Sequence, residues 1–198
     1  MVVLREMRQE EYSAYCQYFI DDYSQEIAKN YGHSIDLSIE LAKKELQPCF
    51  PNGLEGNEHS LLCIDAEVDG QLNRVGYLWH SINATDHSTF IYDFFVSGEY
   101  RGLGYGTQDT SALEKELQEV GINQIKLRVA YQNERALKLY QEVGFVITGF
   151  KLYQEVGFVI TGFKLYQEVG FVITGFKLYQ EVGFVITGFN MSKKIGMS

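Results

Sequence analysis

Two adjacent segments decide the fold: Phe90-Ile91-Tyr92-Asp93-Phe94-Phe95-Val96, and then Arg101-Gly102-Leu103-Gly104-Tyr105-Gly106. The first segment is apolar and rich in β-favouring residues, and the residues from Thr107 to Val120 have the pattern of a helix. A glycine-rich turn between a strand and a helix directs several backbone N–H groups to one point, at the positive end of the helix dipole. We therefore expect an anion site here, for which a diphosphate is the usual ligand.

The residue types of this loop suit an anion, but the glycine spacing alone does not identify a nucleotide. Glycine lets the backbone turn tightly and approach an anion without a Cβ atom in the way, and Arg101 can add charge-assisted hydrogen bonds to a phosphate. The glycines at 102, 104 and 106 leave Thr107 where the dinucleotide-binding fingerprint has its last glycine, and no lysine follows as in a P-loop. By themselves the glycines are equally typical of an ordinary strand-to-helix turn.

Length and composition indicate one globular domain with an acidic surface. The chain has 198 residues, of which 45% are hydrophobic and 22% charged, so it is long enough for a real core. A net charge of −9 disfavours nucleic acid as a partner and suits a cationic substrate, although acidity also serves solubility alone. Cys16, Cys49 and Cys63 lack the spacing of metal ligands and indicate free thiols in a reducing compartment. With no apolar leader and no apolar run that spans a bilayer, we expect a cytoplasmic protein without metal or membrane.

The hydrophobic pattern predicts an α+β domain. We expect strands at Val2–Arg5, His59–Val68, Arg74–Asn83, Ser88–Val96 and 124–130. We expect helices at Glu10–Asn30, Asp36–Gln47, 107–120 and 134–143. Asp69-Gly70 predicts a hairpin turn between the second and third strands. This order gives an antiparallel front half and a parallel β-α-β back half.

Further motifs follow the glycine loop in a definite order. They are the strand Ile125–Val129, then Asn133, Ala136, the pair Leu139-Tyr140 and the pair Gly144-Phe145. This order resembles the GNAT superfamily of acetyl-CoA-dependent N-acetyltransferases. The resemblance covers most of residues 1–150 and the last few residues. The segment Ile91-Tyr92-Asp93-Phe94 and the ending Met191-Ser192-Lys193-Lys194 are similar to one branch of poorly characterised bacterial members. The resemblance implies a GNAT fold: a mixed central sheet with helices on both faces, in which two strands separate around the cofactor.

The resemblance also implies how acetyl-CoA is held. The diphosphate is expected on the backbone of the loop with Arg101, and the thioester carbonyl on a backbone N–H near the end of the preceding strand. Asn133 resembles the family asparagine that contacts the cofactor and starts a helix, and Tyr140 the tyrosine that gives a proton to the leaving thiolate. A core aromatic is the alternative role of Tyr140. The candidate cofactor-binding residues are Phe95, Val96, Arg101, Gly102, Leu103, Gly104, Tyr105, Gly106, Thr107 and Asn133.

Asp93, three residues before Val96, is the candidate general base. Family members often carry a carboxylate in this neighbourhood, but a structural, hydrogen-bonding acid is the alternative. The polyamine acetyltransferases have a similar Asp-Phe-Phe-Val preceded by glutamate; here Tyr92 stands in that place, which weakens a polyamine assignment. Strand alternation places Tyr92 and Asp93 on opposite faces. His59 and Glu55 are further candidates for the base, although a lone histidine more often has a structural role.

The acceptor is expected to be the amine of a small molecule or a peptide. Acidic and aromatic residues on the first helix suit such a site, and a solvated helix face is the simpler interpretation of them. These residues are Asp21, Asp22, Tyr23 and Glu26.

A tandem repeat occupies residues 138–189. The 13 residues Lys138-Leu139-Tyr140-Gln141-Glu142-Val143-Gly144-Phe145-Val146-Ile147-Thr148-Gly149-Phe150 recur without change at 151–163, 164–176 and 177–189. Such a unit is shorter than the repeats of solenoid proteins and barely long enough for a parallel crossover, so we do not expect a solenoid.

The repeat leaves two ways to complete the last strand. Copy two places Leu152 and Val156 where the unrepeated sequence has Met191 and Ile195, so it keeps the apolar alternation. The acetyltransferase domain would then end at residue 156, and residues 157–198 would form a surplus, β-rich segment that pairs locally, pairs with a second chain or stays loose. Alternatively, the surplus bulges out and the last copy supplies the final strand. Both leave Phe-Val-Ile-Thr segments able to pair edge to edge, so a homodimer or higher self-association is expected as a hazard.

The sequence thus predicts an N-acetyltransferase in which a primary amine attacks acetyl-CoA directly in a ternary complex. Two rival interpretations stay open. One is a CoA-binding protein without catalysis, and the other is a self-assembling variant created by the repeat.

Overall fold

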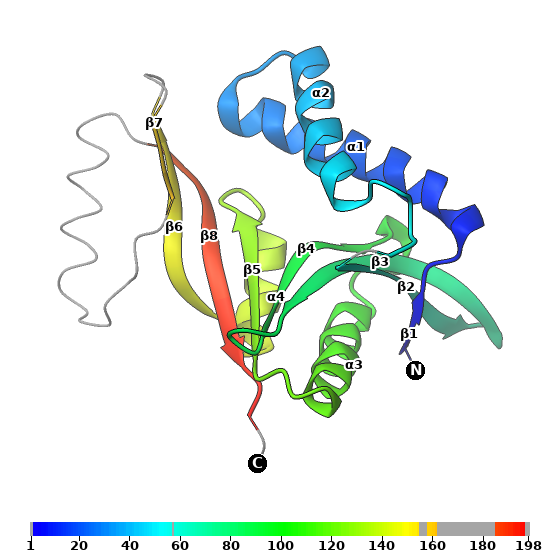
Figure 1. Ribbon diagram of the computed structural model, residues 1–198. Helices are drawn as coiled ribbons and strands as arrows, with labels where there is room; N and C mark the ends of the chain where they lie inside the picture. The colour runs from blue at the N-terminus through cyan, green and yellow to red at the C-terminus, as the bar shows by residue number, and fades with distance from the viewer. Residues whose placement is uncertain (1, 57, 155–157, 162–184, 197–198) are drawn as a thin grey trace. The chain divides into compact units, whose positions relative to one another are not determined.

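The computed structural model describes residues 2–56, 58–154, 158–161 and 185–196, and the chain divides into two compact units (Figure 1). The first unit comprises residues 1–125 and 195–198, and the second comprises residues 126–194. Each unit contains its own run of hydrogen-bonded strands together with helices, so the expected α+β class is confirmed.

The first unit consists of four antiparallel strands and three α-helices. Its elements are β1 (Val2–Glu6), α1 (Gln9–Tyr31), α2 (Ile35–Leu46), β2 (His59–Val68), β3 (Gln71–Asn83), β4 (Ser88–Val96) and α3 (Tyr105–Glu119), with short 3-10 turns at Gln47–Cys49 and Gly98–Tyr100. The strands lie in the order β1-β2-β3-β4, with α1 and α2 on one side of the sheet and α3 on the other (Figure 1). The expected antiparallel front half is confirmed, and the bounds of β2 and β4 coincide with the predicted ones.

Local signals explain where these elements begin and end. The Ser34 side chain accepts a hydrogen bond from the Leu37 N–H at 3.3 Å and so caps the start of α2. Gly32 ends α1 in the left-handed region, with φ of 67°. Asp69 and Gly70 have φ values of 52° and 77°, as the tight turn between β2 and β3 requires. The predicted hairpin is therefore confirmed.

The core of this unit lies between α1 and the sheet. Its buried side chains are Met7, Tyr15, Phe19, Leu46, Phe50, Leu61, Cys63, Tyr77 and Trp79. Trp79 and Tyr15 are almost fully buried, and Phe19 packs edge-on against Trp79 with ring centroids 5.3 Å apart. Aromatic side chains bury the most area per residue and prefer this tilted geometry, so they dominate the packing of α1 on the sheet.

A charged network fastens the first turn of α1 to the sheet. Arg5 of β1 donates to both carboxylate oxygens of Glu11 at 2.7 and 2.8 Å, and its Nε donates to Asp65 of β2 at 2.6 Å. Arg74 of β3 also reaches Glu11, at 3.3 Å. The hydrogen bonds from Arg5 are the main reason that the pKa of Glu11 falls to about 2. A bidentate arginine–carboxylate pair fixes the relative orientation of the two side chains as well as their distance. The start of α1 is therefore held in one orientation.

The second unit contains β5 (Gln124–Ala130), which begins at the junction of the units, α4 (Glu134–Glu142), β6 (Val146–Gln154), β7 (Phe158–Thr161) and β8 (Val185–Lys194). Its strands lie in the order β5-β8-β6-β7, and β6 pairs antiparallel with both β7 and β8. The Asn133 side chain accepts a hydrogen bond from the Ala136 N–H at 3.1 Å and caps α4, as its position before the helix predicts.

The repeat supplies three strands of this unit. β6 joins the end of copy one to the start of copy two, β7 lies in copy two, and β8 contains the end of copy four and the residues after it. Phe150 and Phe189, the last residues of copies one and four, are direct partners in the β6–β8 pair. β8 lies next to β5 in the strand order, and its side chains Ile186 and Met191 are buried. The last copy and the residues after it therefore supply this strand. The domain boundary at residue 156 stays a prediction, because residues 155–157 and 162–184 lie outside the described residues.

Deletion of residues 151–189 tests whether the extra copies are needed for folding. The deletion joins Phe150 to Asn190 and so recreates, directly after α4, the ten-residue sequence of β8. Because the core of the first unit lies outside the repeat, we expect a single cooperative thermal transition by circular dichroism and a smaller hydrodynamic size by gel filtration. A shortened chain without a cooperative transition would show that the added copies are part of the fold.

Candidate active site

The glycine loop opens α3 as the sequence predicts, although the helix begins two residues earlier than expected. Gly102 and Gly104 have φ values of 83° and 81°, a region that other residues rarely adopt. Gly104 is the N-cap, and the first helical hydrogen bond runs from the Gln108 N–H to the Gly104 carbonyl at 3.1 Å. The N–H groups of residues 105–107 therefore precede the helical ladder and are available to an outside acceptor.

The space around the loop is open to a ligand. A Cβ atom at Gly102 would meet no heavy atom within 4 Å, and one at Gly104 only the Gln108 side chain at 3.9 Å. An anion can therefore approach this backbone closely, as a diphosphate bound at a helix N-terminus does. The Arg101 side chain contacts the end of β4. Its Nε donates to the Val96 carbonyl at 2.6 Å, and its guanidinium lies 5.4 Å from the centre of the Phe95 ring. It ties the loop to the end of β4, while its contact with a phosphate stays a prediction.

The end of β4 depends on a glycine in the neighbouring strand. Gly76 of β3 is the register partner of Val96, and a Cβ atom there would overlap the carbonyl oxygen of Phe95. The same Cβ atom would lie 2.9 Å from the Ile64 side chain. Only glycine lets β3 and β4 approach so closely, so Gly76 determines where the backbone of Phe95 and Val96 lies.

A bulge in β4 overturns one expectation from the sequence. Trp79 of β3 pairs with Asp93 and His80 pairs with Ile91, so Tyr92 is an extra residue without a register partner. The alternation of side chains is interrupted there, and both Tyr92 and Asp93 face the side of the sheet that carries α1. The prediction that they lie on opposite faces is wrong, because it assumed a regular strand.

Asp93 accepts hydrogen bonds from two tyrosines of α1. The hydroxyl of Tyr15 donates to Oδ2 at 3.2 Å, and that of Tyr18 donates to Oδ1 at 3.3 Å. Burial among protein atoms raises the pKa of Asp93 to about 7, and the negative charge of Asp22 adds to the rise, while the two hydroxyls oppose it. A carboxyl group with such a pKa exchanges its proton near neutral pH.

Tyr92 is an exposed aromatic ring that its neighbours hold in place. It stacks on Trp79 with ring centroids 4.8 Å apart, and His59 and Phe90 contact it edge-on at 5.0 and 4.9 Å. Ser81 donates a hydrogen bond to its hydroxyl at 3.3 Å. With 44% of its surface exposed, Tyr92 offers an ordered aromatic face next to Asp93.

Comparison with known proteins identifies the chain. Residues 16–145 match the Acetyltransferase (GNAT) family. The chain belongs to this family. It is 31% identical over 146 residues to the uncharacterised N-acetyltransferase YycN of Bacillus subtilis, a match that covers 73% of this chain and 92% of YycN.

Solved structures agree on the fold. The crystal structure of YycN from Bacillus subtilis aligns with a TM-score of 0.67 and 29% identity over 83% of this chain and 99% of that one. A spermidine N-acetyltransferase of Vibrio cholerae, solved with CoA and spermine, aligns with a TM-score of 0.57 over 98% of this chain and 95% of that one. Its identity is only 17%, so it bears on the fold alone. The mixed α+β sheet of a GNAT acetyltransferase, expected from the sequence, is confirmed.

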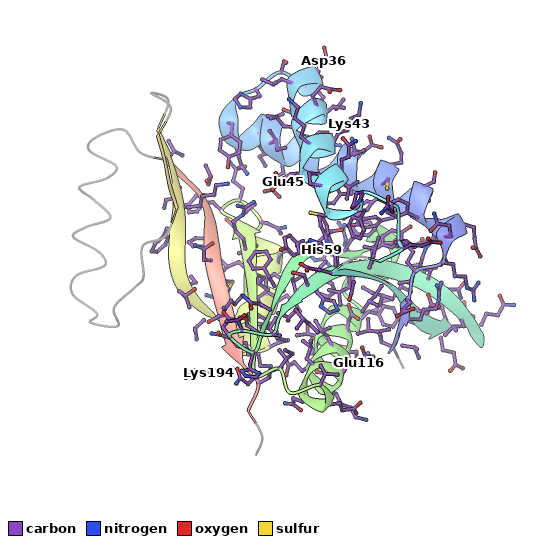
Figure 2. The ribbon with its side chains drawn as sticks, viewed as in Figure 1. Asp36, Lys43, Glu45, His59, Glu116 and Lys194 are labelled. Atoms are coloured by element: carbon purple, nitrogen blue, oxygen red, sulfur yellow. The ribbon has the colours of Figure 1, made fainter. Side chains whose placement is uncertain are left out.

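The ring of His59 accepts a hydrogen bond from the core of the first unit. The residue lies at the first position of β2 and is labelled in Figure 2. The indole N–H of Trp79 donates to Nδ1 of His59 at 3.0 Å, so a neutral His59 ring carries its own proton on Nε2. Burial lowers the pKa of the ring, which keeps it neutral. Neither ring nitrogen of His59 therefore has a free lone pair that could accept a proton. Glu55, the other further candidate, lies exposed in the turn before β2.

The remaining GNAT candidates lie in the second unit. Tyr140 of α4 is 6% exposed and packs against Phe145 with ring centroids 5.4 Å apart. Asn133 caps the same helix. The structure describes both residues within their own unit, so the proton-donor role of Tyr140 and the cofactor contact of Asn133 stay predictions.

Tyr15 and Tyr18 are the site residues that sequence reasoning missed. Their spacing of three residues places both hydroxyls on one helix face, but nothing in the sequence indicates that this face meets Asp93. Asp21 and Asp22 of α1 are both exposed: the charge of Asp22 raises the pKa of Asp93, and Asp21 accepts a hydrogen bond from Gln17.

Among the described residues, no group of three or more histidine, cysteine, aspartate or glutamate side chains is arranged to hold a metal ion. No helix among the described residues is long and apolar enough to cross a membrane.

Replacement of Gly76 by alanine tests the close approach of β3 and β4. Because the new methyl group overlaps the Phe95 carbonyl, we expect a loss of about 1–3 kcal/mol in the free energy of unfolding and slower acetyl transfer. Urea denaturation and a thiol-release assay measure the two effects. Gly98→Ala is the matched control, since a Cβ atom there meets nothing within 4 Å. Equal stability and turnover in both variants would contradict the argument.

Proposed function

We propose that this protein transfers the acetyl group of acetyl-CoA to the nitrogen of a primary amine while both substrates are bound. The observation that supports this most is the open glycine turn, with positive φ at Gly102 and Gly104, which leads into α3 shortly after β4 in a chain of the acetyltransferase family. Acetyl-CoA supplies the acetyl group as a thioester.

Two parts of the first unit are assigned to the cofactor. The backbone N–H groups of residues 103–107 bind the diphosphate, with Arg101 beside them. A backbone N–H near Phe95 or Val96 donates to the thioester carbonyl and stabilises the negative charge that develops on its oxygen. In the second unit, Asn133 contacts the cofactor.

Two side chains are assigned to proton transfer. An alkylamine has a pKa of about 10.4, so it must lose a proton before it can attack at neutral pH. Asp93, with a pKa of about 7, is ionised in a useful fraction of molecules and takes this proton directly or through water. Tyr140 gives a proton to the sulfur of the departing CoA.

The amine acceptor is proposed to be a small molecule or a peptide. The net charge of −9 favours a cationic substrate, and Tyr92 stands where the polyamine enzymes have glutamate. We further propose that the protein is bacterial and works in the cytoplasm. A direct screen for thiol release over a library of amines tests the proposal, because acetyl transfer to any amine liberates CoA.

Asp93→Asn tests the base. The amide keeps the size of the side chain but cannot take a proton, so we expect kcat to fall by about 100-fold or more at pH 7. Binding of acetyl-CoA, measured by calorimetry, should not change. Asp36→Asn, an exposed acid on α2 labelled in Figure 2, is the control and should keep full activity. An active Asp93→Asn enzyme would leave Asp93 as a structural acid.

Tyr140→Phe tests the proton donor. Loss of the hydroxyl should lower kcat by about 10-fold or more and leave the KM for acetyl-CoA nearly unchanged, because the ring still fills its place in the core. Steady-state thiol release gives both constants. Tyr131→Phe, which alters an exposed tyrosine of the same unit, is the control. Unchanged turnover in the Tyr140 variant would make it a core aromatic only.

A further inference from the structure

Each oxygen of the Asp93 carboxyl group has its own hydrogen-bond donor. Tyr15 reaches Oδ2 and Tyr18 reaches Oδ1, at 3.2 and 3.3 Å. The two tyrosines lie three residues apart on α1 and so on the same helix face. Two donors on two oxygens determine the plane of the carboxyl group as well as its position.

The two phenol rings are themselves held firmly. Tyr15 has no exposed surface and packs edge-on against Tyr77 with ring centroids 5.2 Å apart. Tyr18 lies on Phe95 at 4.1 Å and stacks on Tyr77 at 5.5 Å. Burial raises the pKa of both hydroxyls, so they keep their protons and act as donors at any working pH.

Charged groups act on Asp93 and on the residues around it. Asp22, one turn after Tyr18 on α1, disfavours a second negative charge at Asp93. Arg101, from the glycine loop, acts favourably on the charged forms of both Tyr18 and Asp22. β3 contributes aromatic rings, with Trp79 opposite Asp93 in the register, and the Phe94 N–H of β4 itself favours the carboxylate.

We propose that Tyr15 and Tyr18 are positioning residues that hold the Asp93 carboxylate in one orientation and, as hydrogen-bond donors, favour its ionised form. This inference rests on the proposed function in assigning Asp93 as the proton acceptor. Tyr15, Tyr18 and Asp22 occupy one face of α1, and the network of Arg5, Glu11 and Asp65 holds the start of that helix on the sheet. One helix therefore carries the groups that orient the Asp93 carboxyl group and the groups that affect its protonation equilibrium.

The proposal predicts opposite shifts from two kinds of substitution. Tyr15→Phe and Tyr18→Phe each remove one donor to the carboxylate, so the midpoint for ionisation of Asp93 should rise by about half to one pH unit. Asp22→Asn removes a repelling charge, so the midpoint should fall. Tyr77→Phe is the matched control, because its ring packs in the same cluster while the hydroxyls that donate to Asp93 belong to Tyr15 and Tyr18.

Two measurements report the pH at which Asp93 is half-ionised. Infrared difference spectra against Asp93→Asn report the carboxyl stretching band of Asp93 as the pH changes, without any need for turnover. The acidic limb of kcat, measured with one amine for all variants, should move with that band. At a fixed pH below the limb, kcat of the tyrosine variants, taken as a fraction of each protein's own plateau, should be about three- to ten-fold lower than that of the parent.

The inference is overturned if the midpoints of the tyrosine variants and of Asp22→Asn equal that of the parent, or if all move in the same direction. Opposite shifts of the infrared midpoint support it even where no amine is acetylated. That last result would count against the proposed function alone, so the two failures are distinguishable.

Discussion

The extra residue in β4 is the constraint on which the candidate site depends. In a regular strand Tyr92 and Asp93 would face opposite sides of the sheet. With the bulge, both face α1, so Asp93 meets Tyr15 and Tyr18 while Tyr92 covers Trp79. Four residues later the same strand ends at the backbone that Gly76 allows to come close, and the glycine loop follows. One strand therefore carries the acid and leads into the glycine loop.

The acid at position 93 balances two opposing effects. Surrounding protein atoms and Asp22 favour the neutral carboxyl group, whereas the hydroxyls of Tyr15 and Tyr18 favour the carboxylate. A fully solvated aspartate would be a weak base at neutral pH, and a buried one without donors would stay protonated. Tyr15 and Tyr18 keep this balance only while α1 stays in place, and the ion pairs of Glu11 with Arg5 and Arg74 hold its first turn on the sheet.

The sequence predicted the elements and the loop well, because these depend on local signals. Asp69-Gly70 has the turn residues of a tight hairpin, and the glycines before α3 have the positive φ values that the anion site needs. The partners of Asp93 were not predictable, because they depend on a bulge and on the packing of a helix about 75 positions away. The hydrogen bond from Trp79 to His59 was not predictable for the same reason, since it joins different strands. The four identical copies of the repeat also carry no information about which of them forms β8.

The most direct test of the account is the affinity of the purified chain for acetyl-CoA, measured by titration calorimetry. The parent chain should bind, and Gly104→Val should lose at least about ten-fold in affinity, because a side chain at that φ strains the turn and blocks the N–H groups that open α3. Gly121→Val makes the same change at a glycine with nearly the same φ beyond the far end of α3, and should bind like the parent. No binding by the parent chain, or equal binding by all three proteins, would contradict the assignment of this loop to the cofactor.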